Sequence, residues 1–211
     1  MQVKNGNAEP AEYTHLVSAK SAFVTLMVAQ IIIGYEWLTS GVTKIASGNF
    51  VSGLADSLKG ANPGTPRWYT SFIHGTVIPH SHIFALSIEV GEVFVGVTFI
   101  AAAIIWVTRW KRLPDMVRGV ILVLVFLSAF SGVLMALNFH LAMGANHPWN
   151  IPKDGFDETI DLDTVMIFLQ LALMAFSACL LCKLRKARKA TKLSQGNEAD
   201  VAIGALLAKG S

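Results

Sequence analysis

Residues 83–106 read IFALSIEVGEVFVGVTFIAAAIIW, an apolar run interrupted by Glu89 and Glu92. A carboxylate at bilayer depth costs about 3 kcal/mol or more, so it is normally kept only where it faces a protein interior and has a partner. Residues three apart share one face of a helix, so the two acids point the same way, and Gly96 lies further along that face. The stretch therefore predicts a membrane-spanning helix whose acidic face packs against other helices.

The composition of the whole chain is that of a membrane protein. Of its 211 residues, 53% are hydrophobic and only 15% are charged, whereas a soluble domain carries about 25% charged residues. Four apolar runs reach the roughly 20 residues that a helix needs to cross a bilayer. They are Ala22–Ile45, Ile83–Trp106, Val117–Leu137 and Val165–Leu184. We expect an all-α fold, a four-helix transmembrane bundle with a long outer loop between its first and second helices.

The basic residues indicate how this bundle is oriented. All but four of the 17 Lys and Arg residues lie on one side of the predicted bundle: before the first run, from the end of the second to the start of the third, or from the end of the fourth onward. The positive-inside rule then places both termini in the cytoplasm. Residues 1–20 become a flexible cytoplasmic lead-in, 21–184 the membrane domain and 185–211 a basic cytoplasmic tail. Such a tail suits contact with anionic lipid headgroups, and the charge distribution gives no reason to expect nucleic acid as a partner.

The outer loop, residues 46–81, carries two apolar patches. Its first patch has helical spacing and predicts a short amphipathic helix on the outer surface; it consists of Phe50, Val51, Leu54 and Leu58. Its second patch is aromatic and consists of Trp68, Tyr69, Phe72 and Ile73. Trp and Tyr favour the membrane interface, so the aromatic patch is either an interfacial anchor or a lid over a lateral ligand pocket.

Polar side chains converge on the outer half of the bundle. A helical rise of 1.5 Å per residue places Glu36 roughly 13 Å, Glu89 roughly 9 Å and Glu92 roughly 14 Å below the outer surface. Lys44 lies at that surface, and Asn138 and His140 end the third span. Either Asp161 or Asp163 can cap the fourth helix. This convergence indicates a buried polar site that opens outward.

The acids admit a structural and a chemical interpretation. Glu89 and Glu92 could bind Asn138 or the Ser40 and Thr43 hydroxyls and hold the helices together. Alternatively, they move protons at a quinone ring, because quinone reduction takes two electrons and two protons and needs a protonatable group near each carbonyl. The chain has no glycine-rich nucleotide loop and no iron–sulfur cysteines. The electron donor would therefore be another subunit or a small substrate that reacts directly.

Metal binding is a weaker expectation. Five of the six histidines lie on the outer side, and they are His74, His80, His82, His140 and His147. Their spacing matches no closed zinc pattern, and no span interior carries the pair of facing histidines that a haem would use. We predict no tightly bound metal or haem.

Four segments of the chain, in matching order, resemble the DoxX family of membrane proteins. GYEWLTSGVTKI at 34–45 is similar to that family's opening helix, and the long loop FVSGLADSLKGANPGTPRWYTSFIHGTVIPH at 50–80 resembles its DoxD branch. GEVFVGVTFI at 91–100 matches the second helix, and NFHLA at 138–142 is similar to the polar end of the third. The resemblance covers about residues 20–180.

The resemblance implies a four-helix bundle of a prokaryotic cell membrane. It also implies the membrane subunit of a thiosulfate:quinone oxidoreductase, which oxidises thiosulfate to tetrathionate with a small companion subunit. Glu92, Lys44 and Asn138 fall at the matching motif positions.

We therefore expect a quinone-linked oxidoreductase subunit. Its expected partners are membrane lipid, quinone, a second small subunit or redox partner protein, and further copies of itself in a homo-oligomer. Its proton-handling residues would be Glu89, Glu92 and Glu36. Its substrate-binding residues would be Lys44, Asn138, His140, Trp68 and Tyr69, with Lys44 attracting an anion at the outer face. Two alternatives stay open: a non-catalytic membrane scaffold or anchor for a redox partner, and a transporter.

Overall fold

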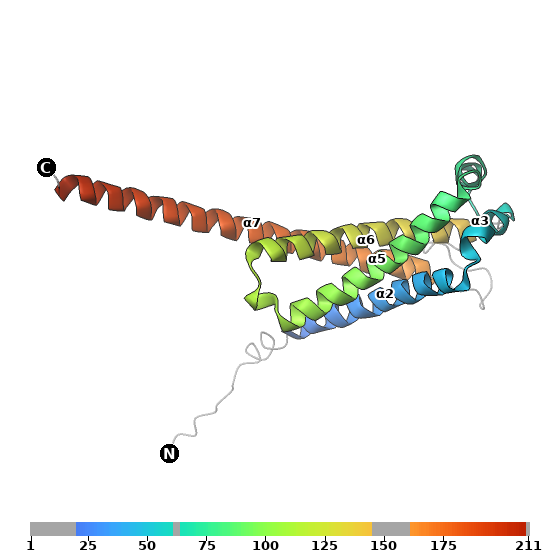
Figure 1. Ribbon diagram of the computed structural model, residues 1–211, viewed down its shortest axis with the longest axis horizontal. Helices are drawn as coiled ribbons and strands as arrows, with labels where there is room; N and C mark the ends of the chain where they lie inside the picture. The colour runs from blue at the N-terminus through green and yellow to red at the C-terminus, as the bar shows by residue number, and fades with distance from the viewer. Residues whose placement is uncertain (1–19, 61–63, 145–160, 210–211) are drawn as a thin grey trace, which may run out of the picture.

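The computed structural model describes residues 20–60, 64–144 and 161–209, and these residues form helices and short connections without a strand. Within these ranges, four helices are long and apolar enough to cross a membrane. They are α2 (Lys20–Ser47), α5 (Ser81–Thr108), α6 (Asp115–Met143) and α7 (Leu162–Lys209) (Figure 1). The expected all-α bundle is confirmed, and the chain is an integral membrane protein. The predicted lead-in, Lys20 apart, and His147 lie outside the described residues.

The four helices pack as two pairs, α2 with α5 and α6 with α7, and α5 joins the pairs through α6. Glycines bring α2 and α5 together. A Cβ on Gly96 would lie 2.6 Å from the backbone nitrogen of Leu38, and a Cβ on Gly34 would lie 2.9 Å from the Cβ of Phe99. These positions exclude any larger residue unless the helices separate. Close approach through small residues is how membrane helices gain contact area where the hydrophobic effect no longer drives them together.

Aromatic rings fill the space between the two pairs. Trp37 of α2 lies 6.4 Å from Phe139 of α6, and Trp106 of α5 lies 5.7 Å from Phe176 of α7, between ring centroids. Both tryptophans are almost fully buried. Pairs at such distances add about 0.5–1.5 kcal/mol beyond their buried area. They hold the two helix pairs in one bundle.

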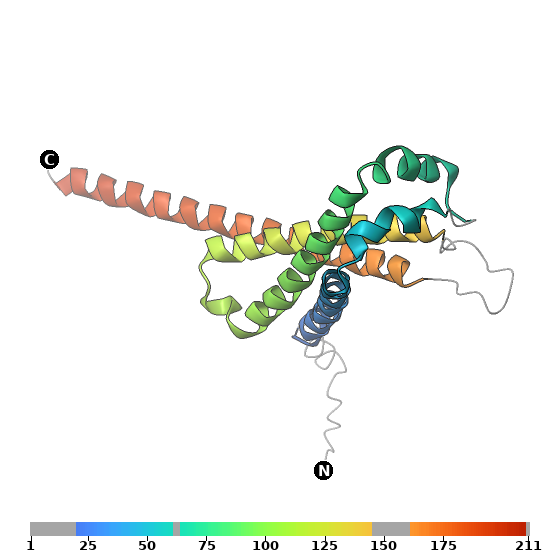
Figure 2. The ribbon, with the colours of Figure 1, turned by 45° about the vertical axis from the view of Figure 1, so that its right-hand side comes forward.

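Short helices cover one end of the bundle, which we call the loop end (Figure 2). They are α3 (Phe50–Lys59), α4 (Arg67–Phe72) and the π-helix η1 (Ile73–Val77). The amphipathic helix expected from Phe50 to Leu58 is confirmed, and its Leu54 is buried. The loop leading into α4 is tied to the end of α6, because Thr65 Oγ1 donates to the Ala142 carbonyl at 3.2 Å. Gly144 ends α6 in the left-handed region at φ 63°.

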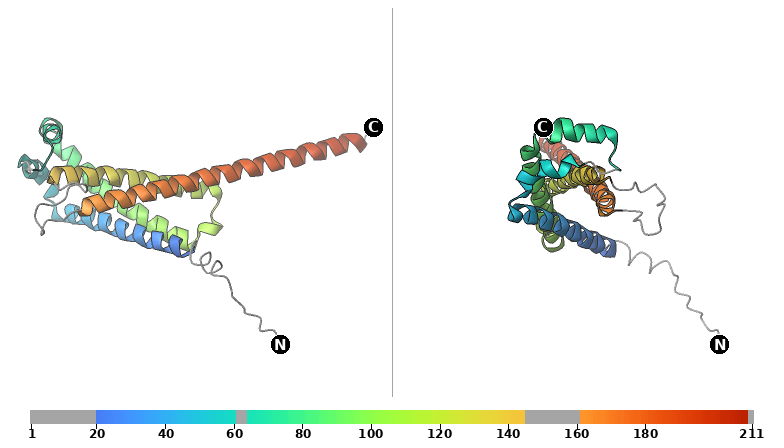
Figure 3. Two further views of the ribbon diagram at one scale, coloured as in Figure 1. Left: turned by 180° about the vertical axis from the view of Figure 1, so that it is seen from behind. Right: turned by 90° about the vertical axis from the view of Figure 1, so that its right-hand side faces the viewer.

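The opposite end, which we call the basic end, has a shorter connection. The 3-10 helix η2 (Trp110–Arg112) links α5 to α6, and Pro114 precedes the first turn of α6. α7 does not stop there. It continues past the bundle as one helix to Lys209 (Figure 3), so the basic tail expected from residue 185 is a direct extension of the fourth span up to that residue.

Candidate functional site

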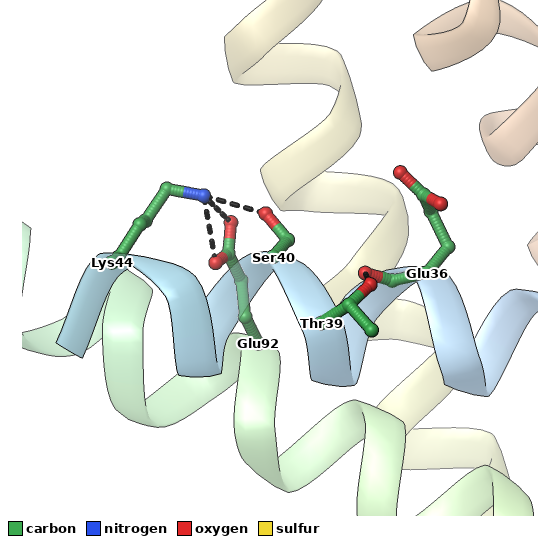
Figure 4. Close-up of polar contacts among 5 residues, drawn as sticks. All are labelled: Glu36, Thr39, Ser40, Lys44 and Glu92. Carbon is green, nitrogen blue, oxygen red and sulfur yellow. Dashed lines mark hydrogen bonds and ion pairs between the residues drawn. The ribbon is translucent and has the colours of Figure 1, made fainter. Parts of the chain in front are cut away.

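An ion pair between α2 and α5 lies near the loop end. Lys44 Nζ is 2.7 and 2.8 Å from the two carboxylate oxygens of Glu92 and donates to Ser40 Oγ at 2.6 Å (Figure 4). The Glu92 side chain is fully buried, whereas that of Lys44 is 21% exposed. The aliphatic part of the Lys44 side chain thus extends from the partly exposed edge of the bundle to the buried carboxylate. Sequence reasoning placed both residues correctly along their helices but did not pair them.

Aromatic rings complete the surroundings of the Lys44 ammonium. Its Nζ lies 5.4 Å from the centroid of Phe50 in α3 and 5.6 Å from that of Phe139 in α6. Cation–π contacts of this kind are worth about 0.5–2 kcal/mol. Lys44 was expected to attract an anionic substrate at the outer surface. That role stays a prediction; in the structure the ammonium contacts Glu92 and lies near both rings.

The other two predicted acids lie apart from this pair. Glu89 is on the same face of α5 as Glu92, as expected, and is 7% exposed; no basic residue in the described part of the chain pairs with it. Glu36 is exposed and lies on α2 before Ser40 and Lys44 (Figure 4). With Trp37, Ser40 and Phe139, and with Asp163 from the start of α7, it lines a small polar hollow of about 70 Å³.

A much larger apolar cavity of about 410 Å³ lies under the short helices of the loop end. Leu54, Phe72 and Ile73 line it from α3, α4 and η1, while α5 and α6 supply the opposite wall with Ile88 and Met135. Part of the aromatic patch therefore covers a lateral pocket, as the lid interpretation requires. Trp68 is different, because it is 66% exposed and suits an interfacial anchor.

Tyr69 and Asn138 form the polar corner of this cavity. The Tyr69 hydroxyl donates to Asn138 Oδ1 at 2.8 Å, and Asn138 Nδ2 donates to the Leu134 carbonyl at 2.6 Å. Burial raises the pKa of the Tyr69 phenol, so it stays a protonated donor at neutral pH. Two of the five residues that the sequence assigned to substrate binding are thus brought together at the wall of a cavity.

His140 points elsewhere. It is buried, with Nδ1 2.9 Å from Asp161 Oδ2 and 3.3 Å from Thr164 Oγ1. Asp161 Oδ1 also accepts from the Thr164 backbone N–H at 3.0 Å, which caps α7 as expected. Burial alone would raise the pKa of Asp161, but hydrogen bonds from Thr164 and His140 outweigh it and hold that pKa below its usual value. His140 is therefore a clamp between α6 and α7, and it does not line the apolar cavity.

Among the described residues, no group of three or more His, Cys, Asp or Glu side chains is arranged to hold a metal ion. His74 of η1, His80 just before α5 and His82 in the first turn of α5 are all exposed.

Phe139 is the residue that sequence reasoning missed. It lines both the apolar cavity and the polar hollow, and its ring contacts the Lys44 ammonium. Only its place between Asn138 and His140 could have drawn attention to it.

A scan of protein-family models, a search of curated proteins and a search of solved structures each found no match to this chain.

Proposed function

We propose that this protein is the membrane subunit of a quinone-linked oxidoreductase and that the quinone ring occupies the apolar cavity at the loop end. The observation that carries the proposal is the cavity itself. Its volume of about 410 Å³ and its mainly apolar lining, in which Ser87 and Ser131 join the Tyr69–Asn138 corner as neutral polar groups, suit a flat lipophilic ring with carbonyl oxygens. Exposed Phe72 and Leu134 belong to its lining, so a membrane-soluble ligand has access from the bilayer.

The polar groups around the cavity support the proton side of this chemistry. A quinone takes up two electrons and two protons when it is reduced. The Tyr69 hydroxyl is a donor at the cavity wall. The Lys44–Glu92 pair stands one aromatic ring away, behind Phe139. We assign proton supply to Glu92 and Glu89, with Glu36 and Asp163 at the neighbouring hollow, and positioning of the ring to Tyr69 and Asn138.

Thiosulfate is proposed as the electron donor because of the resemblance to the DoxD branch. Two thiosulfate ions lose two electrons when they join as tetrathionate, and the quinone takes up those electrons. A companion subunit or redox partner would carry out the thiosulfate step at the loop end. In this proposal both termini are cytoplasmic in a prokaryotic membrane, because the basic end carries the positive charge of the spans.

The test is thiosulfate-dependent reduction of a soluble quinone analogue by the detergent-purified chain. Tyr69→Phe should lower analogue binding several-fold, whereas Trp68→Phe, a neighbouring exposed ring, should leave it unchanged. Glu92→Gln should lower turnover at a temperature where it is still folded. Equal binding by Tyr69→Phe and wild type would refute the placement of the ring. Quinone binding without thiosulfate activity would keep the site and reject the donor.

A second candidate function is supported by the Lys44–Glu92 pair. The acid is buried and its charge is already met by Nζ, which is what an interhelical tie requires. On this alternative the protein is a non-catalytic scaffold or anchor for a redox partner. It predicts that no quinone copurifies with the protein and that Glu92→Gln reduces bundle stability or partner recovery.

A further inference from the structure

A second groove lies at the basic end, between the first turns of α6 and the part of α7 that leaves the bundle. It encloses about 340 Å³. Its walls are apolar, with Val120 and Leu124 from α6 and Leu181 and Leu184 from α7. Gly119 keeps it open, because a Cβ there would have only Leu184 and Arg188 side-chain atoms within 4 Å, at 3.8 and 3.9 Å.

Two arginines line the same groove, Arg185 and Arg188. Arg188 has one acidic neighbour, with Nε 3.9 Å from Asp115 Oδ2. That aspartate is already shared, since its Oδ1 accepts from Arg118 at 3.1 Å. Arg188 Nη2 is shielded from water and has no hydrogen-bond partner among the described residues. Arg185 is exposed, and no ion pair joins it to an acid in the described part of the chain.

The depth of these arginines fits the headgroup layer of a membrane. From Leu162 at the loop end, Arg185 lies roughly 35 Å along α7 at 1.5 Å per residue. The hydrocarbon core is about 30 Å thick. The groove thus has its apolar walls inside the hydrocarbon layer and its guanidinium groups where phosphates lie.

From this geometry we propose that the groove binds one anionic phospholipid, with an acyl chain along Val120 and Leu181 and the phosphate held by Arg185 and Arg188. Guanidinium groups bind phosphate oxygens well because their N–H donors match phosphate geometry. The exposed lysines nearby, Lys186 and Lys189, attract any anionic membrane surface. The groove adds a fixed apolar seat, which turns general attraction into a site. This inference is independent of the quinone proposal.

The experiment is native mass spectrometry of the full-length purified chain with added phosphatidylglycerol or phosphatidylcholine. Wild type should retain phosphatidylglycerol in preference to phosphatidylcholine. Arg185→Gln/Arg188→Gln should weaken phosphatidylglycerol retention about 30-fold, because each guanidinium gives up a charge-assisted hydrogen bond to the phosphate. The matched control, Lys111→Gln/Arg112→Gln, removes two charges from the same end outside the groove and should stay within about threefold of wild type, because in detergent no anionic membrane surface attracts the lipid-free side chains.

A second variant tests the apolar seat without changing charge. Gly119→Val should fill the groove and weaken phosphatidylglycerol retention, while its thermal unfolding in detergent shows that the bundle is intact. Equal loss in the two double variants would show general charge attraction and overturn the site. Full displacement of the lipid by millimolar inorganic phosphate would overturn it too, because the acyl chain would then contribute nothing.

Discussion

Phe139 borders two dissimilar spaces, and their contrast separates what holds this bundle together from what it can bind. Beside it lies the polar cluster, where Lys44 meets Glu92 and Ser40 and where Glu36 and Asp163 line a small hollow. It also lines the apolar cavity, whose polar groups are few and neutral.

The charged space is crowded and its central groups are satisfied, whereas the neutral space is roomy. A hollow of about 70 Å³ holds little more than water, whose share of liquid volume is about 30 Å³ per molecule. A cavity of about 410 Å³ lies within the range of ligand pockets. The comparison shows that Glu92, through its ion pair with Lys44, serves the packing of α2 against α5, and that the space for a ligand lies beside this pair.

The largest effect should come from removing one charge of the polar cluster. Lys44→Ala leaves the fully buried Glu92 without its cation, and breaking a buried pair in this way costs about 3 kcal/mol. We expect a corresponding loss of stability in unfolding by a denaturing detergent. Lys44→Met/Glu92→Leu should recover most of that loss, because no uncompensated charge remains. Wild-type stability of Lys44→Ala would show that the pair contributes nothing to folding.

A substitution in the apolar cavity should change ligand binding and leave stability nearly unchanged. Ser131 lines it, and Ser131→Phe places a ring in the space proposed for the ligand. We expect binding of a fluorescent quinone analogue to weaken about tenfold, about 1.4 kcal/mol, with little change in unfolding. Ser131→Ala, which leaves the space open, is the control. If Ser131→Phe binds the analogue as wild type does, the ligand lies elsewhere.

Sequence reasoning succeeded where one-dimensional patterns suffice. Apolar runs gave all four spans, and helical spacing gave α3. The shared buried face of Glu89 and Glu92 follows from a spacing of three residues. Asp161 was recognised as a possible cap from residue type and position, and it caps α7.

The pairing of side chains could not be read in the same way. Lys44 and Glu92 are 48 positions apart, and nothing in either helix alone shows that the lysine stem bends inward. His140 and Asn138 are two residues apart, yet one faces α7 and the other meets Tyr69. Which neighbour each contacts depends on how the two helix pairs pack, a property of the whole bundle.

A smaller effect should separate the polar corner of the cavity from its apolar walls. Tyr69→Phe keeps the ring but leaves Asn138 Oδ1 without the phenol donor, a loss of about 1 kcal/mol in stability. Because burial raises the pKa of Tyr69, the phenol stays protonated, and wild-type analogue affinity should be constant between about pH 6 and pH 9. A fall in affinity within that interval would point to a different titrating group.

The smallest effect concerns the clamp beside the polar hollow. The pKa of Asp161 is held below its usual value by Thr164 and His140, so its ionised form favours the folded state. That contribution is complete above the ordinary aspartate pKa and is lost as the pH falls through the lowered value.

Asp161→Asn should therefore cost about 1 kcal/mol or less at neutral pH and flatten the acid limb of the stability curve below about pH 4. Detergent unfolding measured across pH checks this. Asp56→Asn is the control, because that carboxylate is solvent-exposed on α3 and, within the described residues, its one ion-pair partner is the exposed Lys59. If both variants change the acid limb equally, the clamp between α6 and α7 has no special role, and the polar side of Phe139 depends on Lys44 and Glu92 alone.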